Sequence, residues 1–259
     1  RQSPVPLNRF QGALIPLSRQ ALGDWQRSPR GLKMLALEQQ EVHAALPEVF
    51  GRHLLQIGSW GVGERLIAAA ETLHRAVLGT VRDEGVAAII DPEHLPLPDK
   101  SIDAVLLPHT LEFARSPHNV LREADRVLSE RGRLFIMGFN PWSGWALRRR
   151  LGFGGRFPAG AHFYSAGRMC DWLELLDFEV MQVRRYGAGF PWLAPHNAGE
   201  AWSLRSLLAG FAEAYLLVAK KRVLPMNFTG KVERAQIKPL VGVPVPAARS
   251  QPFADKKDS

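Results

Sequence analysis

The most constraining feature of this sequence is an alternation of short apolar runs with helical patterns along its central part. An alternation of this kind is typical of a parallel sheet with helices on both faces. The last two predicted strands are expected to form an antiparallel pair at the sheet edge. The predicted strands are "HLLQIG", "RAVLGTV", "VAAIID", "SIDAVLLPH", "RLFIMGF", "EVMQVRRYG" and "EAYLLVAKK". The predicted helices are residues 32–46, "ERLIAAAETLH", "PHNVLREADRVLSERG" and "SAGRMCDWLELLDFE", the last with Ser165 as its cap.

The stretch "LLQIGSWGVGERL", residues 54–66, joins the first of these strands to the helix that follows it. Glycines at such a junction let the backbone approach a bound nucleotide closely, as in many strand–turn–helix units that bind nucleotides. Gly58, Gly61 and Gly63 do not follow the Gly-x-Gly-x-x-Gly order of dinucleotide enzymes, and no acid ends the second strand. A glycine loop that holds a cofactor is therefore predicted, and an NAD enzyme is disfavoured.

Three parts are predicted along the chain: an N-terminal arm over residues 1–31, a domain over residues 32–222, and a basic tail over residues 223–259. The domain includes an irregular insertion over residues 142–164. The arm and the tail lack hydrophobic periodicity, so we expect them to have little structure of their own. The net charge of +8 comes mainly from the two ends of the chain. Solvated ends explain this charge without a nucleic-acid partner, which the sequence permits but does not support.

The composition excludes several classes of protein. The only cysteine, Cys170, cannot form an internal disulfide, and no Cys/His cluster has the spacing of a metal site. A phosphate-binding Gly-x-x-x-x-Gly-Lys-Ser/Thr motif is absent from the sequence. The start of the sequence shows no signal-peptide pattern, and no window of about 18 residues is both apolar and uncharged. We therefore expect a cytoplasmic protein without a membrane span and without a metal.

Residues 95–141 contain an ordered series of short motifs. They are Leu95-Pro96, Asp103 before "AVLLPH", Leu111-Glu112, "EADRVL" and Gly132. This series closely resembles the class I S-adenosylmethionine-dependent methyltransferases of the small-molecule (type 11) kind. With the glycine stretch in register, the resemblance covers about residues 50–222. It implies an α/β, Rossmann-like fold with a mostly parallel seven-stranded sheet, S-adenosylmethionine as the cofactor and a small-molecule acceptor.

The resemblance also implies which residues hold the cofactor, and several of them depart from the family pattern. Gln56 stands where the first strand usually carries an acid, and Trp60 stands where the next glycine is expected. Either the loop has gained a residue, or the indole occupies space near the methionine moiety of the cofactor. The contacts implied at this loop are Gln56, Gly58, Ser59, Trp60, Gly61 and Gly63.

Two further contacts are implied at the ends of the second and third strands. The acid that normally holds the ribose hydroxyls is replaced by Thr80 or Val81, with Asp83 as the nearest carboxylate. Asp91 matches the acid expected near the adenine amino group. Pro92 follows it, where the family usually offers a backbone N–H that proline lacks.

His109 ends the strand "AVLLPH" on the edge where open α/β sheets bind their ligands. Two interpretations are open: a general base or polar contact to cofactor or substrate, or a hydrogen-bonded histidine at a strand end. Asn140 also follows a strand and is a candidate to line the same pocket. The basic run 148–150 indicates either an acidic or phosphate-bearing acceptor or a solvated helix face. Cys170 has no evident His–Asp partner, so it is not a candidate nucleophile.

Two functions from different classes follow from these observations. The first is methyl transfer, a direct displacement that requires alignment of the reactants more than it requires a catalytic side chain. The second is a catalytically inactive relative that keeps the fold as a binding or scaffold module. It is suggested by the several cofactor-binding positions that differ from the family pattern at once. The two predict opposite environments for Trp60: displaced from the cofactor space, or filling it.

Overall fold

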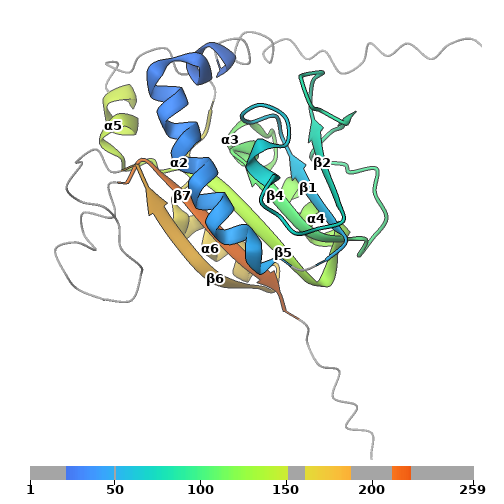
Figure 1. Ribbon diagram of the computed structural model, residues 1–259. Helices are drawn as coiled ribbons and strands as arrows, with labels where there is room; N and C mark the ends of the chain where they lie inside the picture. Colours follow the sequence, from blue (N-terminus) through green and yellow to red (C-terminus); the bar gives the residue numbers. More distant parts are fainter. Residues whose placement is uncertain (1–21, 50, 151–160, 188–211, 223–259) are drawn as a thin grey trace, which may run out of the picture. The chain divides into compact units, whose positions relative to one another are not determined.

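The computed structural model describes residues 22–49, 51–150, 161–187 and 212–222 (Figure 1). The described strands form one seven-stranded sheet in the order β3-β2-β1-β4-β5-β7-β6. β7 runs antiparallel to both of its neighbours, and the other pairs are parallel. The strands are β1 (His53–Ile57), β2 (His74–Gly79), β3 (Ala88–Ile89), β4 (Ile102–Pro108), β5 (Leu128–Phe139), β6 (Phe178–Tyr186) and β7 (Ala214–Lys221).

This order confirms the mostly parallel seven-stranded sheet. It also confirms that the last two strands form an antiparallel pair at one edge, with β6 outermost and β7 between β6 and β5. The residues of β7 from Ala214 to Ala219 are accordingly buried throughout, whereas most residues of the edge strand β6 are only partly covered. Neighbouring strands cover both edges of β7, and the two hydrophobic cores cover its faces.

The sheet changes direction between β1 and β4. The chain runs outward from β1 through β2 to β3, and then crosses back to β4 on the other side of β1. At such a switch point the loops after two neighbouring parallel strands diverge and leave room for a ligand at the carboxyl edge of the sheet. The glycine loop after β1 and His109 after β4 therefore start from adjacent strand ends.

Helices cover both faces of the sheet (Figure 1). The helix α2 lies on one face with a hydrophobic core that includes Trp60, Phe135 and Phe139. The helices α4 and α6 lie on the other face with a second core, to which Leu134 and Ile136 of β5 contribute. The described helices are α2 (Pro29–Ala45), α3 (Thr110–Phe113), α4 (Pro117–Val127), α5 (Gly144–Arg150) and α6 (Ala166–Glu174), with the 3-10 turns η1 (Leu46–Glu48) and η2 (Arg65–Ile67). The predicted cap Ser165 is confirmed, since its side chain accepts a hydrogen bond from the Arg168 backbone N–H.

The helix predicted after the glycine loop is wrong. Residues 65–67 form only a 3-10 turn, and the chain continues through turns to β2. The crossover must return along β1, a distance of about 16 Å for five residues at about 3.3 Å each. An α-helix rises only about 1.5 Å per residue, whereas a 3-10 turn rises about 2 Å and extended chain rises more. Ten residues separate Gly63 from His74 and would span about 15 Å as an α-helix, so length alone does not exclude one, yet only the turn η2 forms there.

The expectation of a loosely structured arm over residues 1–31 is wrong for its described part. Residues 22–27 are helical, Pro29 opens α2, and the Trp25 side chain is only 6% exposed. Its indole contacts the rings of Trp60 and Phe139, which explains why this segment is ordered. The basic tail, residues 223–259, and the middle of the insertion, residues 151–160, lie outside the described residues. None of the described helices is long and apolar enough to cross a membrane.

Candidate functional site

The glycine loop begins with a position that only glycine can occupy. Gly58 has φ of +112°, and a Cβ atom built on it would lie 2.5 Å from Oγ1 of Thr110. That hydroxyl donates a hydrogen bond to the Ile57 carbonyl and so ties the end of β1 to the start of α3. The next two glycines, Gly61 and Gly63, also have positive φ values of +76° and +53°. The loop is thus a series of left-handed turns beside the end of β4.

The same loop touches the loop that follows β2. A Cβ atom built on Gly85 would lie 2.4 Å from the Cα of Gly63, so the two backbones are in direct contact. Thr80 at the end of β2 is half-buried beside them. Asp83 is exposed, and its carboxylate accepts a hydrogen bond from the Glu84 backbone N–H in its own turn. The carboxylate considered as a substitute for the missing ribose acid is therefore engaged locally.

Gln56 lies beneath the loop and is completely buried. Its Nε2 donates to the carbonyl oxygens of Gly58 at 3.0 Å and Trp60 at 3.4 Å. An acid at this position would direct its oxygens at the same two carbonyls, which explains why an amide replaces the expected carboxylate. The Gln56 Oε1 atom and the Ser59 Oγ atom are buried without a hydrogen-bond partner among the described residues. Such orphan atoms are rare in protein interiors, because burial without a partner costs about 1–3 kcal/mol.

Trp60 is turned into the interior, where it is 2% exposed. Its Nε1–H donates to Oε2 of Glu38 at 2.5 Å. Its ring centroid lies 4.2 Å from that of His109 and 5.9 Å from that of Phe139. The indole thus fills the space between α2 and the end of β4, where its N–H has a hydrogen-bond partner.

His109 joins two buried carboxylates. Its Nε2 is 2.8 Å from Oε1 of Glu38, and its Nδ1 is 2.8 Å from Oε2 of Glu112. The other Glu112 oxygen accepts the backbone N–H of Phe139 at 2.5 Å. All three ionisable side chains are at most 2% exposed. We call Glu38, Trp60, His109 and Glu112 the buried cluster.

The electrostatics of the buried cluster fix the state of the imidazole. Burial by itself would lower the pKa of His109, but the facing carboxylates of Glu112 and Glu38 outweigh it and raise that pKa to about 9. Burial raises the pKa of Glu112, and the imidazolium opposes this shift only in part. At neutral pH both ring nitrogens of His109 therefore carry protons and donate them to carboxylates. No ring nitrogen is free to accept a proton, which argues against the general-base interpretation of His109.

The backbone of His109 is also unusual. It has φ of 53° and ψ of 18°, in the left-handed region, immediately before α3. A non-glycine residue in this region stores strain that the surrounding contacts must hold, and such positions cluster at functional sites. The two carboxylates and the rings of Trp60 and Phe139 supply those contacts. The same edge of the sheet is therefore both strained and closely packed.

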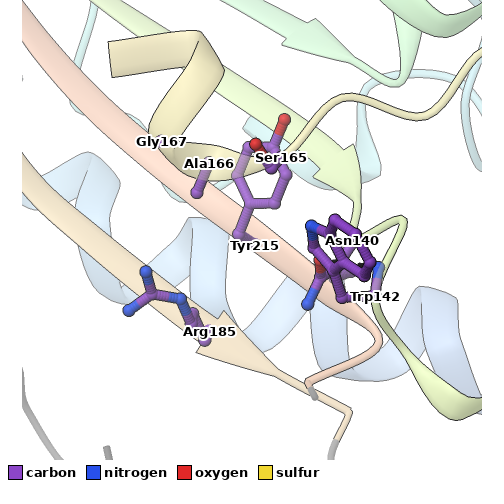
Figure 2. Close-up of a pocket in the computed structure, with 8 residues that line it drawn as sticks. Asn140, Trp142, Ser165, Ala166, Gly167, Arg185 and Tyr215 are labelled. Carbon is purple, nitrogen blue, oxygen red and sulfur yellow. Dashed lines mark hydrogen bonds between the residues drawn. The ribbon is translucent and has the colours of Figure 1, made fainter. Parts of the chain in front are cut away.

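A pocket opens at the same edge of the sheet beyond Phe139 (Figure 2). Its cavity volume is about 140 Å³. Asn140 lies at its rim and donates from Nδ2 to the Ala212 carbonyl, while its Oδ1 accepts the Trp142 backbone N–H. The lining residues are Asn140, Trp142, Ser165, Ala166, Gly167, Arg185, Ala214 and Tyr215. Asn140 thus lines a pocket that does not include His109, and it also shapes the turn that follows β5.

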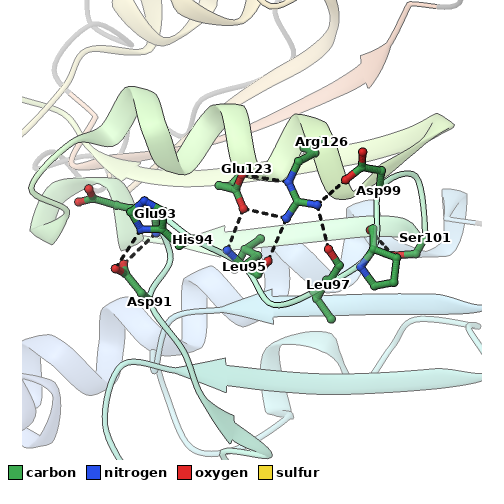
Figure 3. A network of polar contacts seen from close by, with 10 residues as sticks. Asp91, Glu93, His94, Leu95, Leu97, Asp99, Ser101, Glu123 and Arg126 are labelled. Carbon is green, nitrogen blue, oxygen red and sulfur yellow. Dashed lines mark hydrogen bonds and ion pairs between the residues drawn. The ribbon is translucent and has the colours of Figure 1, made fainter. Parts of the chain in front are cut away.

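Asp91 and Pro92 follow β3 at the surface. The Asp91 carboxylate accepts the Glu93 backbone N–H at 3.0 Å and lies 3.2 Å from Nδ1 of His94 (Figure 3). It is exposed and therefore accessible to a ligand, unlike the buried cluster. Pro92 is half-buried next to it.

The loop after Asp91 is held by α4 (Figure 3). Arg126 donates to the carbonyl oxygens of Leu95 and Leu97, both at 2.9 Å, and pairs with Asp99 at 2.5 Å. Arg126 also pairs with Glu123 at 2.8 Å, and Glu123 in turn accepts the Leu95 backbone N–H at 2.8 Å. We call Leu95, Leu97, Asp99, Glu123 and Arg126 the loop network. It explains why the Leu-Pro pair and the "EADRVL" motif occur together in the sequence.

Sequence reasoning missed the two carboxylates of the buried cluster. Glu112 was noted only as part of a motif, and Glu38 was not singled out. A signal for Glu38 existed, because it shares one helix face with the buried residues Met34 and Val42, at a spacing of four. A charged residue in the middle of an apolar stripe needs a buried partner.

Two other candidates are placed away from this chemistry. Cys170 is half-buried on α6, where burial raises the pKa of its thiol. The side chains of Arg148 and Arg149 lie outside what the structure describes. Within the described ranges, no group of three His, Cys, Asp or Glu residues is arranged to hold a metal ion.

Comparison with known proteins places this geometry in a family. The model of the family described as "Methyltransferase domain" matches residues 65–136. The uncharacterized protein YafS of Escherichia coli (strain K12) is 34% identical over 239 residues, which cover 92% of this chain and 96% of YafS.

Solved structures share the fold at low sequence identity. A SAM-dependent methyltransferase of Thermotoga maritima aligns with a TM-score of 0.55 and 19% identity, over 76% of this chain and 98% of that chain. The Burkholderia thailandensis 1,6-didemethyltoxoflavin-N1-methyltransferase, solved with 1,6-didemethyltoxoflavin and S-adenosylhomocysteine, aligns with a TM-score of 0.53 and 13% identity. That alignment covers 86% of this chain and 94% of the Burkholderia chain. With its strand order and glycine loop, this chain belongs to the class I S-adenosylmethionine-dependent methyltransferase family and is a relative of YafS.

Proposed function

We propose that this protein is an active S-adenosylmethionine-dependent methyltransferase that acts on a small-molecule acceptor. The observation that carries the proposal is the orphan Oε1 atom of Gln56, buried beneath the glycine loop at the switch point of the sheet. The orphan Oγ atom of Ser59 lies on the same loop. A bound ligand that donates hydrogen bonds there would remove both penalties. The residues present thus fit a cofactor with a donor group at its methionine end.

In this proposal the methionine moiety lies along the loop from Gly58 to Gly63, where positive φ angles bring the backbone close to a ligand. Gln56 Oε1 accepts a hydrogen bond from the amino group of that moiety. Thr80 offers one hydroxyl to the ribose, and the exposed Asp91 carboxylate accepts from the adenine amino group. Pro92 contributes shape without an N–H.

The bound cofactor would supply an electrophilic methyl group on a positively charged sulfur. The chain's own residues then have to align the acceptor with that methyl group and exclude water. His109 is not required as a base, because an acceptor that loses its proton on methylation can release it to solvent. The two carboxylates around one imidazolium keep the buried cluster from being a net cation, which favours a positively charged cofactor nearby.

A second function is favoured by one specific observation. Trp60 is 2% exposed, its N–H is bonded to Glu38, and it contacts three other rings. A buried indole beside the glycine loop is what a decayed cofactor site would contain, although its hydrogen bond to Glu38 of α2 also matches the packing under the N-terminal helix expected for a working loop. Under this alternative the chain keeps the family fold as a binding or scaffold module.

Equilibrium binding separates the two functions. We expect S-adenosylmethionine and S-adenosylhomocysteine to bind the purified full-length chain saturably in titration calorimetry. Replacing Gln56 by Met removes the proposed acceptor and should weaken binding of S-adenosylmethionine about tenfold to hundredfold, which corresponds to one hydrogen bond from a charged ammonium group. Gln182→Met, on the edge strand β6, is the matched control and should bind as the parent does. A folded protein that releases no heat with either ligand at millimolar concentration would favour the binding module.

A further inference from the structure

The pocket beyond Phe139 shares the carboxyl edge of the sheet with the proposed cofactor site and has a different character. Phe139 stacks on His109 with ring centroids 4.1 Å apart, and Asn140, the next residue, lines the pocket. The opposite wall comes from Tyr215 of β7 and from the first turn of α6. In Figure 2, Arg185 and Trp142 lie on either side of Tyr215. None of the lining residues belongs to the glycine loop; the pocket lies at the same carboxyl edge of the sheet, on the face that α6 covers.

The pocket contains the guanidinium of Arg185, for which the described part of the chain offers no side-chain partner. Arg185 makes no ion pair or hydrogen bond with any side chain among the described residues, and none of the lining residues is acidic. Its neighbour Arg184 lies on the opposite face of β6 and pairs with Glu41 of α2 at 3.7 Å. The two arginines share a strand and a charge, but only Arg185 is available to a ligand in the pocket.

The remaining polar groups of the pocket also favour a negative charge. Ser165, Ala166 and Gly167 lie at the start of α6, whose N-terminal amides carry the positive end of the helix dipole. The planar guanidinium matches a carboxylate, since it can donate two parallel hydrogen bonds.

The apolar part of the lining is aromatic. The Trp142 side chain is 66% exposed at the rim, an unusual position for an indole that no ligand covers. The Tyr215 hydroxyl already donates to the Tyr164 carbonyl at 3.0 Å, so Tyr215 offers its ring and not a hydrogen bond. Aromatic rings bind planar ligands by stacked or edge-to-face contacts. The cavity volume of about 140 Å³ is close to that of cavities that bind a single benzene ring.

We infer that this pocket binds the methyl acceptor, and that the acceptor is an aromatic carboxylate: its ring contacts Trp142 and Tyr215, and its carboxylate pairs with Arg185. The inference rests on the proposed function only where it identifies the ligand as the methyl acceptor. The ligand class follows from the pocket itself.

The test uses benzoate and 4-hydroxybenzoate as probes, with benzamide as the neutral analogue of the same shape. We expect both acids to bind the full-length chain saturably, and benzamide to bind about tenfold to hundredfold more weakly, as for loss of a charge-assisted hydrogen bond. Arg185→Met should weaken the acids by a similar factor, while the matched variant Arg184→Met should leave their affinity unchanged. Equal affinity for benzoate and benzamide, or for the parent and Arg185→Met, would overturn the inference.

Inorganic phosphate tests the aromatic part. It should compete only weakly with benzoate, because it cannot contact Trp142 and Tyr215. Phosphate that competes as well as benzoate would contradict an aromatic ligand. S-adenosylmethionine is titrated into the same samples, and its affinity should be unaffected by Arg185→Met. If the acids do not bind but S-adenosylmethionine does, only this inference is wrong. If the acids bind but S-adenosylmethionine does not, only the proposed function is wrong.

Discussion

The buried cluster and the loop network both join distant parts of the chain through charged side chains, but they do so in opposite surroundings. The buried cluster links α2, the glycine loop and the end of β4, and its ionisable groups are at most 2% exposed. The loop network links α4 to the segment after β3, and its Arg126 side chain is 32% exposed. Charges out of water interact strongly and become very costly if a partner is lost, whereas half-exposed pairs are weakened by solvent.

The two regions also differ in the kind of group that their charged side chains contact. The Arg126 contacts to Leu95 and Leu97 are to backbone carbonyls, as expected of a group that fixes the course of a loop. The buried cluster fixes side chains against one another at the edge where a ligand would bind. Its charges and its strained His109 backbone are therefore the features that would affect cofactor binding.

The largest effect is expected for Trp60→Gly. The indole is buried between Glu38, His109 and Phe139, so its removal should lower the free energy of unfolding by about 3–5 kcal/mol, as for other large-to-small changes in cores. Urea denaturation measures this loss, and Trp142→Gly, at an exposed indole, should cost much less.

Binding of S-adenosylmethionine to the Trp60→Gly variant sharpens the result. If the loop works as a cradle, affinity should stay similar or fall. A gain in affinity would show that the indole plugs the site and would favour the binding module.

The next effect concerns pH. The pKa of His109 is about 9 in the folded chain against about 6.5 for a free histidine, so the folded state holds this proton more tightly. The resulting stabilisation of about 3 kcal/mol is fully present below about pH 6.5 and is lost as the pH rises through about 9. Unfolding free energies measured across this window should fall accordingly.

His109→Gln tests the assignment of that pH dependence. The variant should be less stable at neutral pH, and its stability should change less between about pH 6.5 and about pH 9 than that of the parent. His162→Gln, at an exposed histidine, is the control and should keep the parent profile. An unchanged profile in His109→Gln would mean that the imidazole is not charged in the folded state.

A smaller effect is expected for Arg126→Met in the loop network. The change removes hydrogen bonds to Leu95 and Leu97 and two ion pairs, all in a half-exposed position. We expect a loss of about 1–2 kcal/mol in the free energy of unfolding. Lys100→Met, which removes an exposed pair with Glu130, should leave stability unchanged within error. A loss for Arg126→Met as large as that for Trp60→Gly would remove the energetic distinction between the two regions.

The smallest effect is expected for a chain that ends at Arg222. Both polar regions lie within residues 38–126, and the tail that follows carries prolines at 225, 239, 244 and 246 and no periodic hydrophobic pattern. Thermal unfolding should therefore have nearly the same midpoint with and without residues 223–259. A fall of many degrees would show that the tail contributes to the folded domain.

Much of the fold could be predicted from the sequence, because strands and helices are encoded by local periodicity. Runs such as Ala104–Leu107 are apolar throughout, as expected for a strand covered on both faces, and all four residues are buried. The prediction failed after the glycine loop, where a segment with helical spacing forms only the 3-10 turn η2. It also failed at Trp25, whose burial depends on two rings far away in the sequence.

The sequence by itself determined the family, the order of elements and the positions of Gly58, Asp91 and His109, since these follow from motifs within short segments. Only the tertiary structure decided what His109 and Trp60 do. Glu38 is 71 residues from His109 along the chain, and no local pattern predicts that the two meet at 2.8 Å. The protonation of His109, the orientation of the indole and the unpaired oxygen of Gln56 all depend on that packing. Charge, burial and hydrogen bonding in a protein interior are properties of neighbours in space, and only the folded chain specifies those neighbours.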